Sequence, residues 1–316
     1  MTGPSPNMQA VLDQLAAEDA GLADPTTLPS QHGRALADLT NLRWNADLPP
    51  VREARTVMHA GLPGRWIVPE NDTGTDAILH VHGGGWAFCS VATHEGASRR
   101  LANACGCPVL TVDYRLAPEH PYPAGLEDIL RAWWGCDPAR RWSLAGDSAG
   151  ANLALAAALR LAAMGEAPPA TLLLFYGVYG ADFETESYRA RENGPGLTRA
   201  KMMRYWDWYA PTPMRDDPCV APVVAADAAL AALPPLYLNA AGLDPLLSDT
   251  EQLVARLRDL GRDDRFDRIE GVVHGFMQMG TALPEARSAF ERAGAAFRDI
   301  TSTAAQGGTA QQGGRP

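Results

Sequence analysis

A serine inside a glycine-flanked pentapeptide is the strongest candidate in this sequence for covalent chemistry. Residues 146–150 read Gly-Asp-Ser-Ala-Gly, a pattern that occurs at sharp turns from a strand into a helix. The apolar segment 142–146 predicts the strand, and the Ala/Leu-rich segment 149–163 predicts the helix. Such a turn needs small residues on both sides, and it lifts the hydroxyl off the sheet. The pattern therefore predicts Ser148 as a nucleophile.

A serine nucleophile needs a base, and the sequence leaves one candidate. Serine is weakly nucleophilic until an adjacent base activates it. In folds with this type of turn, the chain order is serine, acid, histidine. Of the seven histidines, only His274 follows Ser148. It comes just after the predicted strand 265–270, where a loop could aim it, so we predict His274 as the base.

The acid is less constrained, because many carboxylates lie between the serine and the histidine. Asp244 follows the predicted strand 235–240 and a turn at Ala241–Gly242, which places it at the carboxyl end of a strand. Asp249 is typical of an acid stabilised by the first turn of a helix. Asp267 alternates within a predicted strand. We favour Asp244 as the group that orients the imidazole and stabilises the imidazolium.

A glycine-rich loop follows the predicted strand 77–82 and could supply hydrogen-bond donors. Residues 82–86 read His-Gly-Gly-Gly-Trp. Consecutive glycines allow close approach of the backbone to a ligand, and acyl transfer needs N–H donors where the carbonyl oxygen becomes negative. With the N–H of Ala149, the loop would form a three-donor oxyanion hole. The spacing matches neither phosphate-binding glycine motif; an ordinary glycine-rich turn remains the alternative.

The elements around these motifs predict an α/β fold with an insertion. Strands alternate with helices, which indicates a mostly parallel central sheet flanked by helices. The aromatic-rich segment 180–222 is too long for a simple connection. We expect it to be a helical cap over the sheet's carboxyl edge, with an ordinary surface subdomain as the alternative. The predicted division is an N-terminal helical cap part at 1–45, the first core part at 46–179, the cap insertion at 180–222, the second core part at 223–303 and a disordered tail at 304–316.

Composition limits the partners. Apolar residues make up 46% of the 316, and the formal net charge is −10, which argues against nucleic acid and anionic membranes as partners. The N-terminus lacks signal-peptide features, and the longest apolar runs are far too short to span a bilayer. We therefore expect a soluble cytoplasmic protein with reduced thiols. The Cys105/Cys107 pair lacks a second His/Cys pair nearby, so buried packing is favoured over a metal site.

Taken together, the motifs resemble those of the hormone-sensitive-lipase-like esterases, bacterial family IV. The resemblance covers most of the chain from about residue 77 to 276. The segments that carry it read His-Gly-Gly-Gly-Trp at 82–86, Asp-Tyr-Arg-Leu-Ala-Pro-Glu at 113–119, Gly-Asp-Ser-Ala-Gly at 146–150, Asp-Pro-Leu at 244–246 and His-Gly-Phe at 274–276. The resemblance implies an α/β-hydrolase fold with a helical cap.

The resemblance also implies roles for individual residues. It implies a Ser148, Asp244 and His274 triad, with no metal or cofactor and with a homodimer through an edge strand. The oxyanion donors it implies are Gly84, Gly85 and Ala149. It further implies that His82, Asp147 and Glu119 support neighbouring loops rather than take part in proton transfer.

The expected function is that of a carboxylesterase. We expect it to hydrolyse short- to medium-chain acyl esters, which are small-molecule substrates, through an acyl-enzyme. Trp86 and Phe276 flank the motifs and are candidates for lining the substrate pocket, with ordinary core packing as the alternative. An amidase or arylformamidase on the same fold remains open. A non-catalytic ligand-binding receptor is less favoured, because such relatives typically lose the histidine that is present here at position 274.

Overall fold

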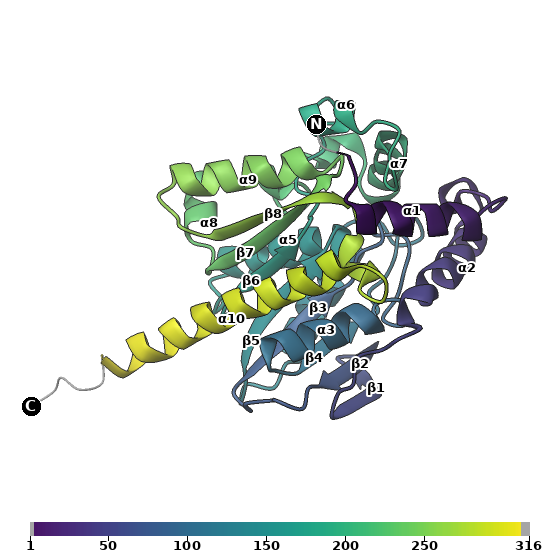
Figure 1. Cartoon of the computed structure of the whole chain (residues 1–316). Coiled ribbons are helices and arrows are strands. Elements are labelled where there is room, and N and C mark those ends of the chain that lie inside the picture. Colours follow the sequence, from purple (N-terminus) through teal and green to yellow (C-terminus); the bar gives the residue numbers. More distant parts are fainter. Residues whose placement is uncertain (1–2, 311–316) are drawn as a thin grey trace, which may run out of the picture.

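A single eight-stranded sheet forms the centre of the protein (Figure 1). The computed structural model describes residues 3–310. The strand order is β1-β2-β4-β3-β5-β6-β7-β8. Strand β2 runs antiparallel to both of its neighbours, and all other pairs are parallel. The predicted mostly parallel sheet is confirmed.

The strands are short, as is usual for the buried centre of an α/β protein. Their bounds are β1 (Glu53–His59), β2 (Leu62–Val68), β3 (Asp76–Val81), β4 (Val109–Val112), β5 (Arg141–Asp147), β6 (Leu172–Phe175), β7 (Leu236–Leu243) and β8 (Arg265–Val273).

Helices connect the strands and cover the sheet. They are α1 (Pro6–Glu18), α2 (Ser30–Asn41), α3 (Glu95–Cys105), α4 (Ala124–Trp134), α5 (Ala149–Ala163), α6 (Glu186–Ala190), α7 (Arg199–Tyr209), α8 (Asp227–Ala231), α9 (Leu247–Asp259) and α10 (Pro284–Ala310). Short 3₁₀ turns are η1 (Pro25–Thr27), η2 (Leu42–Asn45), η3 (Thr212–Met214), η4 (Pro222–Val224) and η5 (Phe276–Met279). Within residues 3–310, no helix is both long and apolar enough to cross a membrane.

Two hydrophobic cores lie on opposite faces of the sheet. Side chains alternate along a strand, so Leu144 of β5 joins the core beneath α4, α5 and α9, whereas Ala145 joins the core beneath α3 and α10. Figure 1 shows α3 and α10 together on one face. Helix α5 lies against β5 and β6 and is buried along nearly its whole length, which explains its Ala/Leu composition.

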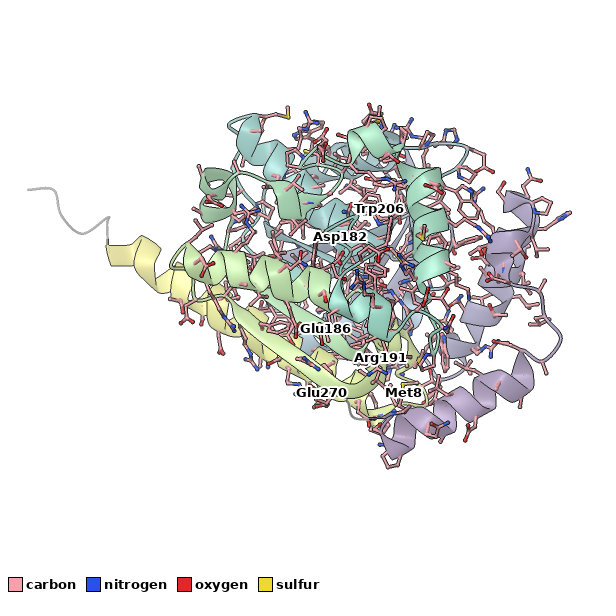
Figure 2. All side chains as sticks on the ribbon, turned by 90° about the horizontal axis from the view of Figure 1, so that it is seen from above. Met8, Asp182, Glu186, Arg191, Trp206 and Glu270 are labelled. Carbon is pink, nitrogen blue, oxygen red and sulfur yellow. The ribbon has the colours of Figure 1, made fainter. Side chains whose placement is uncertain are left out.

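The remaining helices gather at the end of the sheet where the parallel strands terminate. Figure 1 shows α1, α2, α6 and α7 at that end. Helix α1 is anchored to β8, because the N–H of Ser5 donates to the carbonyl of Gly271 at 2.9 Å and Met8 is fully buried. In Figure 2, Met8 is labelled close to Glu270 of β8, whereas Trp206 of α7 is labelled well away from both. The N-terminal segment and α7 meet at that end, because Arg204 Nη1 donates to the carbonyl and the hydroxyl of Thr26, both at 2.9 Å.

Several element boundaries differ from the sequence predictions. Strand β7 continues through Ala241–Gly242, where a turn was predicted, and β8 continues to Val273. The N-cap residue of helix α3 is His94, which makes no side-chain cap hydrogen bond. Helix α10 extends past the predicted boundary at residue 304, and residues 311–316 of the predicted tail lie outside the described residues.

Candidate active site

Ser148 occupies a strained turn between β5 and α5. Its backbone has φ 55° and ψ −122°, a combination that L-residues adopt only when the surroundings enforce it. A Cβ on Gly146 would lie 2.3 Å from the carbonyl oxygen of Gly150, and a Cβ on Gly150 would lie 2.0 Å from that of Val81. Both distances are far below van der Waals contact, so each flanking position accepts only glycine. The turn predicted from the pentapeptide is confirmed.

The sheet brings the two other predicted residues to this serine. Leu243 pairs with Val273 at the ends of β7 and β8, so the next residues, Asp244 and His274, leave the sheet side by side. His274 Nε2 lies 2.9 Å from the Ser148 hydroxyl oxygen. His274 Nδ1 lies 2.7 Å from Oδ2 of Asp244. The geometry is that of a serine whose proton can pass to an imidazole held by a carboxylate.

Asp244 is itself fixed by its surroundings. It is 1% exposed, and its Oδ1 accepts the N–H of Leu246 at 2.8 Å. Because this carboxylate is buried away from solvent, it is a strong hydrogen-bond acceptor for the imidazole N–H. The arrangement favours the tautomer in which Nδ1 carries the proton and Nε2 can accept one from Ser148.

The other two carboxylates considered from the sequence have structural partners instead. Oδ2 of Asp249 accepts the N–H groups of Tyr179 and Gly180, at 3.0 and 2.9 Å. Burial raises the pKa of Asp249 to about 7. Asp267 accepts the Tyr237 hydroxyl at 2.8 Å. Asp249 therefore connects α9 to the chain leaving β6, a role its position in a first helical turn did not indicate.

The glycine loop after β3 presents unused N–H groups beside the serine. Gly84 and Gly85 have φ values of 115° and 59°, and both line the same cavity as Ser148. Across the described range 3–310, the N–H groups of Gly84, Gly85 and Ala149 have no hydrogen-bond acceptor. Donors left free around a serine hydroxyl can hold the oxygen of a tetrahedral intermediate. A Cβ on Gly85 would meet the Tyr205 ring at 2.6 Å, so this position also needs glycine.

Asp147 holds the loop in place. Its Oδ1 accepts the N–H of Gly83 at 3.0 Å and lies 3.4 Å from His94 Nε2 and 3.6 Å from His80 Nε2. Burial alone would raise the pKa of Asp147, but the neighbouring His94 and His80 hold it well below the usual carboxyl range. The carboxylate therefore stays charged. Sequence reasoning assigned no role to His80 or His94, because neither belongs to the recognised motifs.

His82 supports the loop as a neutral ring. Its Nδ1 lies 2.9 Å from the carbonyl oxygen of Gly83, and its ring stacks on Tyr114 with 4.5 Å between centroids. Burial lowers the pKa of His82 to about 3. An imidazole with so low a pKa is a poor proton acceptor, so His82 is unsuited to act as the base for Ser148. Glu119, outside this loop, forms an ion pair with Arg34 of α2.

A cavity of about 270 Å³ opens over the serine and the histidine. Its walls come from the glycine loop, the N-terminal segment, residues 274–279, and helix α7 together with the nearby Leu197. The lining includes Asp24, Pro25, Thr26, Ala37, Thr40, Asn41, Trp44, Phe88, Leu197, Lys201, Met202, Tyr205, Gln278 and Met279. Most of these residues are remote in sequence from the motifs, so only the tertiary structure reveals them.

Trp86 and Phe276, the two candidates for the pocket lining, do not line this cavity. Trp86 is 1% exposed and stacks on Tyr209 with ring centroids 4.2 Å apart. Phe276 is fully buried and packs on Tyr176 at 5.6 Å. That prediction is wrong, and core packing, the alternative, describes both side chains.

No metal-binding arrangement accompanies the site. Among the described residues, no group of three or more His, Cys, Asp or Glu side chains is placed to hold a metal ion. The chemistry that the side chains support is nucleophilic attack by a hydroxyl with an imidazole base and backbone N–H donors.

Comparison with known proteins agrees with this chemistry. Residues 78–278 match the family model of the alpha/beta hydrolase fold. The chain is 34% identical to carboxylesterase NlhH of Mycobacterium tuberculosis over 269 residues, which cover 79% of this chain and 83% of that protein. It is 34% identical to ethyl acetate hydrolase of Pseudomonas putida over 221 residues, 66% of this chain and 69% of that protein.

Solved structures give the same result. The hyperthermophilic esterase from the archaeon Pyrobaculum calidifontis superposes with a TM-score of 0.84 at 31% identity, over 95% of this chain and 99% of that one. An esterase from the bacterial hormone-sensitive lipase family also gives 0.84, at 28% identity over 95% and 99% of the two chains. The chain therefore belongs to the α/β-hydrolase family, among its hormone-sensitive-lipase-like esterases. It is a carboxylic ester hydrolase, as predicted.

Proposed function

We propose that this enzyme hydrolyses small carboxylic esters through an acyl-enzyme formed on Ser148. The observation that carries the proposal is the continuous hydrogen-bonded chain from the Ser148 hydroxyl through His274 to Asp244, with distances of 2.9 and 2.7 Å. His274 Nε2 accepts the hydroxyl proton as the serine oxygen attacks the ester carbonyl carbon. Asp244 stabilises the imidazolium that forms.

The carbonyl oxygen becomes negative at this step. We assign its stabilisation to the N–H groups of Gly84, Gly85 and Ala149, which have no other acceptor in the described part of the chain. Loss of one such donor typically lowers the rate by about 10²–10³-fold. The carbon–oxygen bond to the alcohol then breaks, and His274 returns its proton to the departing alkoxide. Water, deprotonated by the same imidazole, releases the acid and regenerates Ser148.

The cavity supports short acyl groups and a cap that encloses them. Its volume, about 270 Å³, lies below the range of roughly 300–1,000 Å³ typical of drug-sized ligand sites. Two relatives carry names that specify a two-carbon acyl group: ethyl acetate hydrolase and, in Streptomyces hygroscopicus, acetyl-hydrolase. We assign the cap to the N-terminal helices together with α6 and α7, because the N-terminal segment and α7 both line the cavity.

The test is an acyl-chain series of p-nitrophenyl esters from acetate to palmitate. We expect kcat/KM to be highest at butyrate or shorter and to fall at least about tenfold at palmitate, since the small cavity cannot accommodate the added methylenes of a long acyl chain. A maximum at palmitate would contradict the proposed chain length. Acetanilide belongs in the same series, because faster hydrolysis of the anilide than of the ester would make the enzyme an amidase.

A further inference from the structure

The cavity over Ser148 contains a single ammonium group, and it belongs to the only lysine in the sequence, Lys201. Lys201 lies in the first turn of α7 and lines the same cavity as Ser148 and His274. Its side chain is 31% exposed. Arginine supplies all other side-chain cations of this chain apart from histidine, so a lone lysine beside the reacting serine is a distinctive feature of the site.

The ammonium group is only partly engaged by the protein. Its Nζ lies 3.6 Å from Oδ2 of Asp24, an ion pair longer than a hydrogen bond. The other oxygen of Asp24 already accepts the N–H and the hydroxyl of Thr26, both at 2.9 Å. An ammonium carries three donors, and within residues 3–310 Nζ of Lys201 makes no hydrogen bond. Donors therefore remain available for a ligand.

The charges beside Lys201 do not cancel. Arg204, one turn further along α7, donates from Nη1 to the carbonyl and the hydroxyl of Thr26, both at 2.9 Å, which brings a second cation to the same segment. Asp24 forms an ion pair with Lys201 and accepts from Thr26, the residue to which Arg204 donates. The other acid in the cavity lining, Asp147, accepts the N–H of Gly83 at 3.0 Å and lies 3.4 Å from His94 Nε2. Lys201 and Arg204 thus place two cations on this segment, where Asp24 is the one carboxylate paired with Lys201, on a protein with a formal net charge of −10.

We infer that Lys201 makes the enzyme prefer esters that carry a carboxylate close to the reacting carbonyl, in the acyl or the alcohol part. The inference rests on the proposed function, since the reaction is the same hydrolysis and the substrate carboxylate is only bound. A carboxylate on the substrate would accept hydrogen bonds from Nζ while Asp24 continues to hold Thr26. Charge-assisted bonds of this type are stronger than neutral ones.

The test compares two pairs of esters in a pH-stat at pH 8. Each pair replaces a methyl group by a carboxylate: ethyl butyrate with monoethyl succinate, and ethyl acetate with acetoxyacetate. The quantity measured is the ratio of kcat/KM for the charged ester to that for its neutral partner. In Lys201→Gln we expect this ratio to fall about five- to tenfold for at least one pair, the size of a partly exposed charged contact. Lys201→Arg should retain most of the ratio.

Two further variants separate a local charge from a general one. Asp24→Asn can keep the bond to Thr26 but removes the competing charge, so it should raise the ratio about two- to fivefold. Arg189→Gln makes the same change in net charge on α6, at a side chain that is 69% exposed and outside the cavity lining, and should leave the ratio unchanged.

The outcomes are distinct. If Lys201→Gln hydrolyses the neutral esters normally and leaves both ratios unchanged, the inference is wrong while the proposed function stands. An equal effect of Arg189→Gln would also overturn it, because the protein's overall charge would then explain the preference. If the wild-type enzyme hydrolyses none of the four esters, both the inference and the proposed small-ester activity fail.

Discussion

Replacing Asp244 by asparagine should remove most of the activity without disturbing the fold. The amide oxygen can still accept the N–H of Leu246, now 2.8 Å from Oδ1. The amide NH₂ then takes the position of Oδ2, which lies 2.7 Å from His274 Nδ1. Two donors cannot share that contact, so Nδ1 must become an acceptor and the ring proton moves to Nε2. The imidazole then presents a proton to Ser148 and cannot accept one.

The expected loss in kcat is about 10³–10⁴-fold, or about 4–5.5 kcal/mol of transition-state stabilisation. KM should change little, because Asp244 does not line the cavity. The assay is steady-state hydrolysis of p-nitrophenyl acetate, with thermal unfolding as the check on the fold. Asp267→Asn is the matched control: Asp267 bonds to Tyr237 at 2.8 Å, away from the site, and kcat should stay within about threefold of wild type.

Two results would refute this reasoning. One is an Asp244→Asn enzyme that is folded and keeps more than about a tenth of the wild-type kcat, because a tautomer reversal cannot be that mild. The other is an equal loss in Asp267→Asn, which would show that removing a carboxylate from this part of the sheet disturbs the enzyme in general.

Three other substitutions test neighbouring parts of the structure. Gly150→Ala places a Cβ 2.0 Å from the last carbonyl oxygen of β3, so it should lower the free energy of unfolding by about 3 kcal/mol in urea titrations. In the control Gly125→Ala, the Cβ would come no closer than 3.3 Å to the Tyr114 ring, so the free energy of unfolding should change by less than about 1 kcal/mol. Gly85→Ala directs a Cβ at the ring of Tyr205 and should lower kcat about 10²-fold. Combining Gly85→Ala with Tyr205→Ala should recover part of this loss; no recovery would show that the clash with Tyr205 is not its cause. Burial raises the pKa of Asp249 to about 7, so the folded state binds this proton more tightly than the unfolded state does, and its contribution to stability is lost as the pH rises through 7. Between pH 5 and pH 8 the free energy of unfolding of the wild type should therefore fall by about 2–3 kcal/mol more than that of Asp249→Asn. Parallel stability curves for the two proteins would contradict this.

The candidate triad could be predicted because its signals are local sequence patterns or depend on the order of residues along the chain. The pentapeptide at 146–150 needs glycine at both flanks, where Cβ atoms would meet backbone oxygens at 2.3 and 2.0 Å. Only His274 follows Ser148 in the chain. The position of Asp244 was predicted from its place after a strand, although β7 runs to Leu243 and no turn precedes the acid. The structure brings these three side chains within hydrogen-bond distance of one another.

The features that sequence reasoning missed depend on contacts between distant segments. Trp86 and Phe276 are adjacent to catalytic motifs in sequence, but both pack into the core rather than into the cavity. The residues that line the cavity, such as Asp24 and Lys201, meet only when the N-terminal segment and α7 pack together. Buried partners such as Asp249 with Gly180 carry no local pattern, since a backbone N–H belongs to almost every residue.

The most direct test of the central claim, that Ser148 forms the acyl-enzyme, is covalent labelling with a fluorophosphonate followed by peptide mass spectrometry. Ser143→Ala is the matched control, because Ser143 lies on the same strand and its buried hydroxyl has no hydrogen-bond partner in the described residues. We predict one label per chain on the peptide that contains Ser148, full labelling of Ser143→Ala, and neither label nor ester hydrolysis in Ser148→Ala. A Ser148→Ala enzyme that is still labelled and still hydrolyses p-nitrophenyl acetate at the wild-type rate would contradict the account.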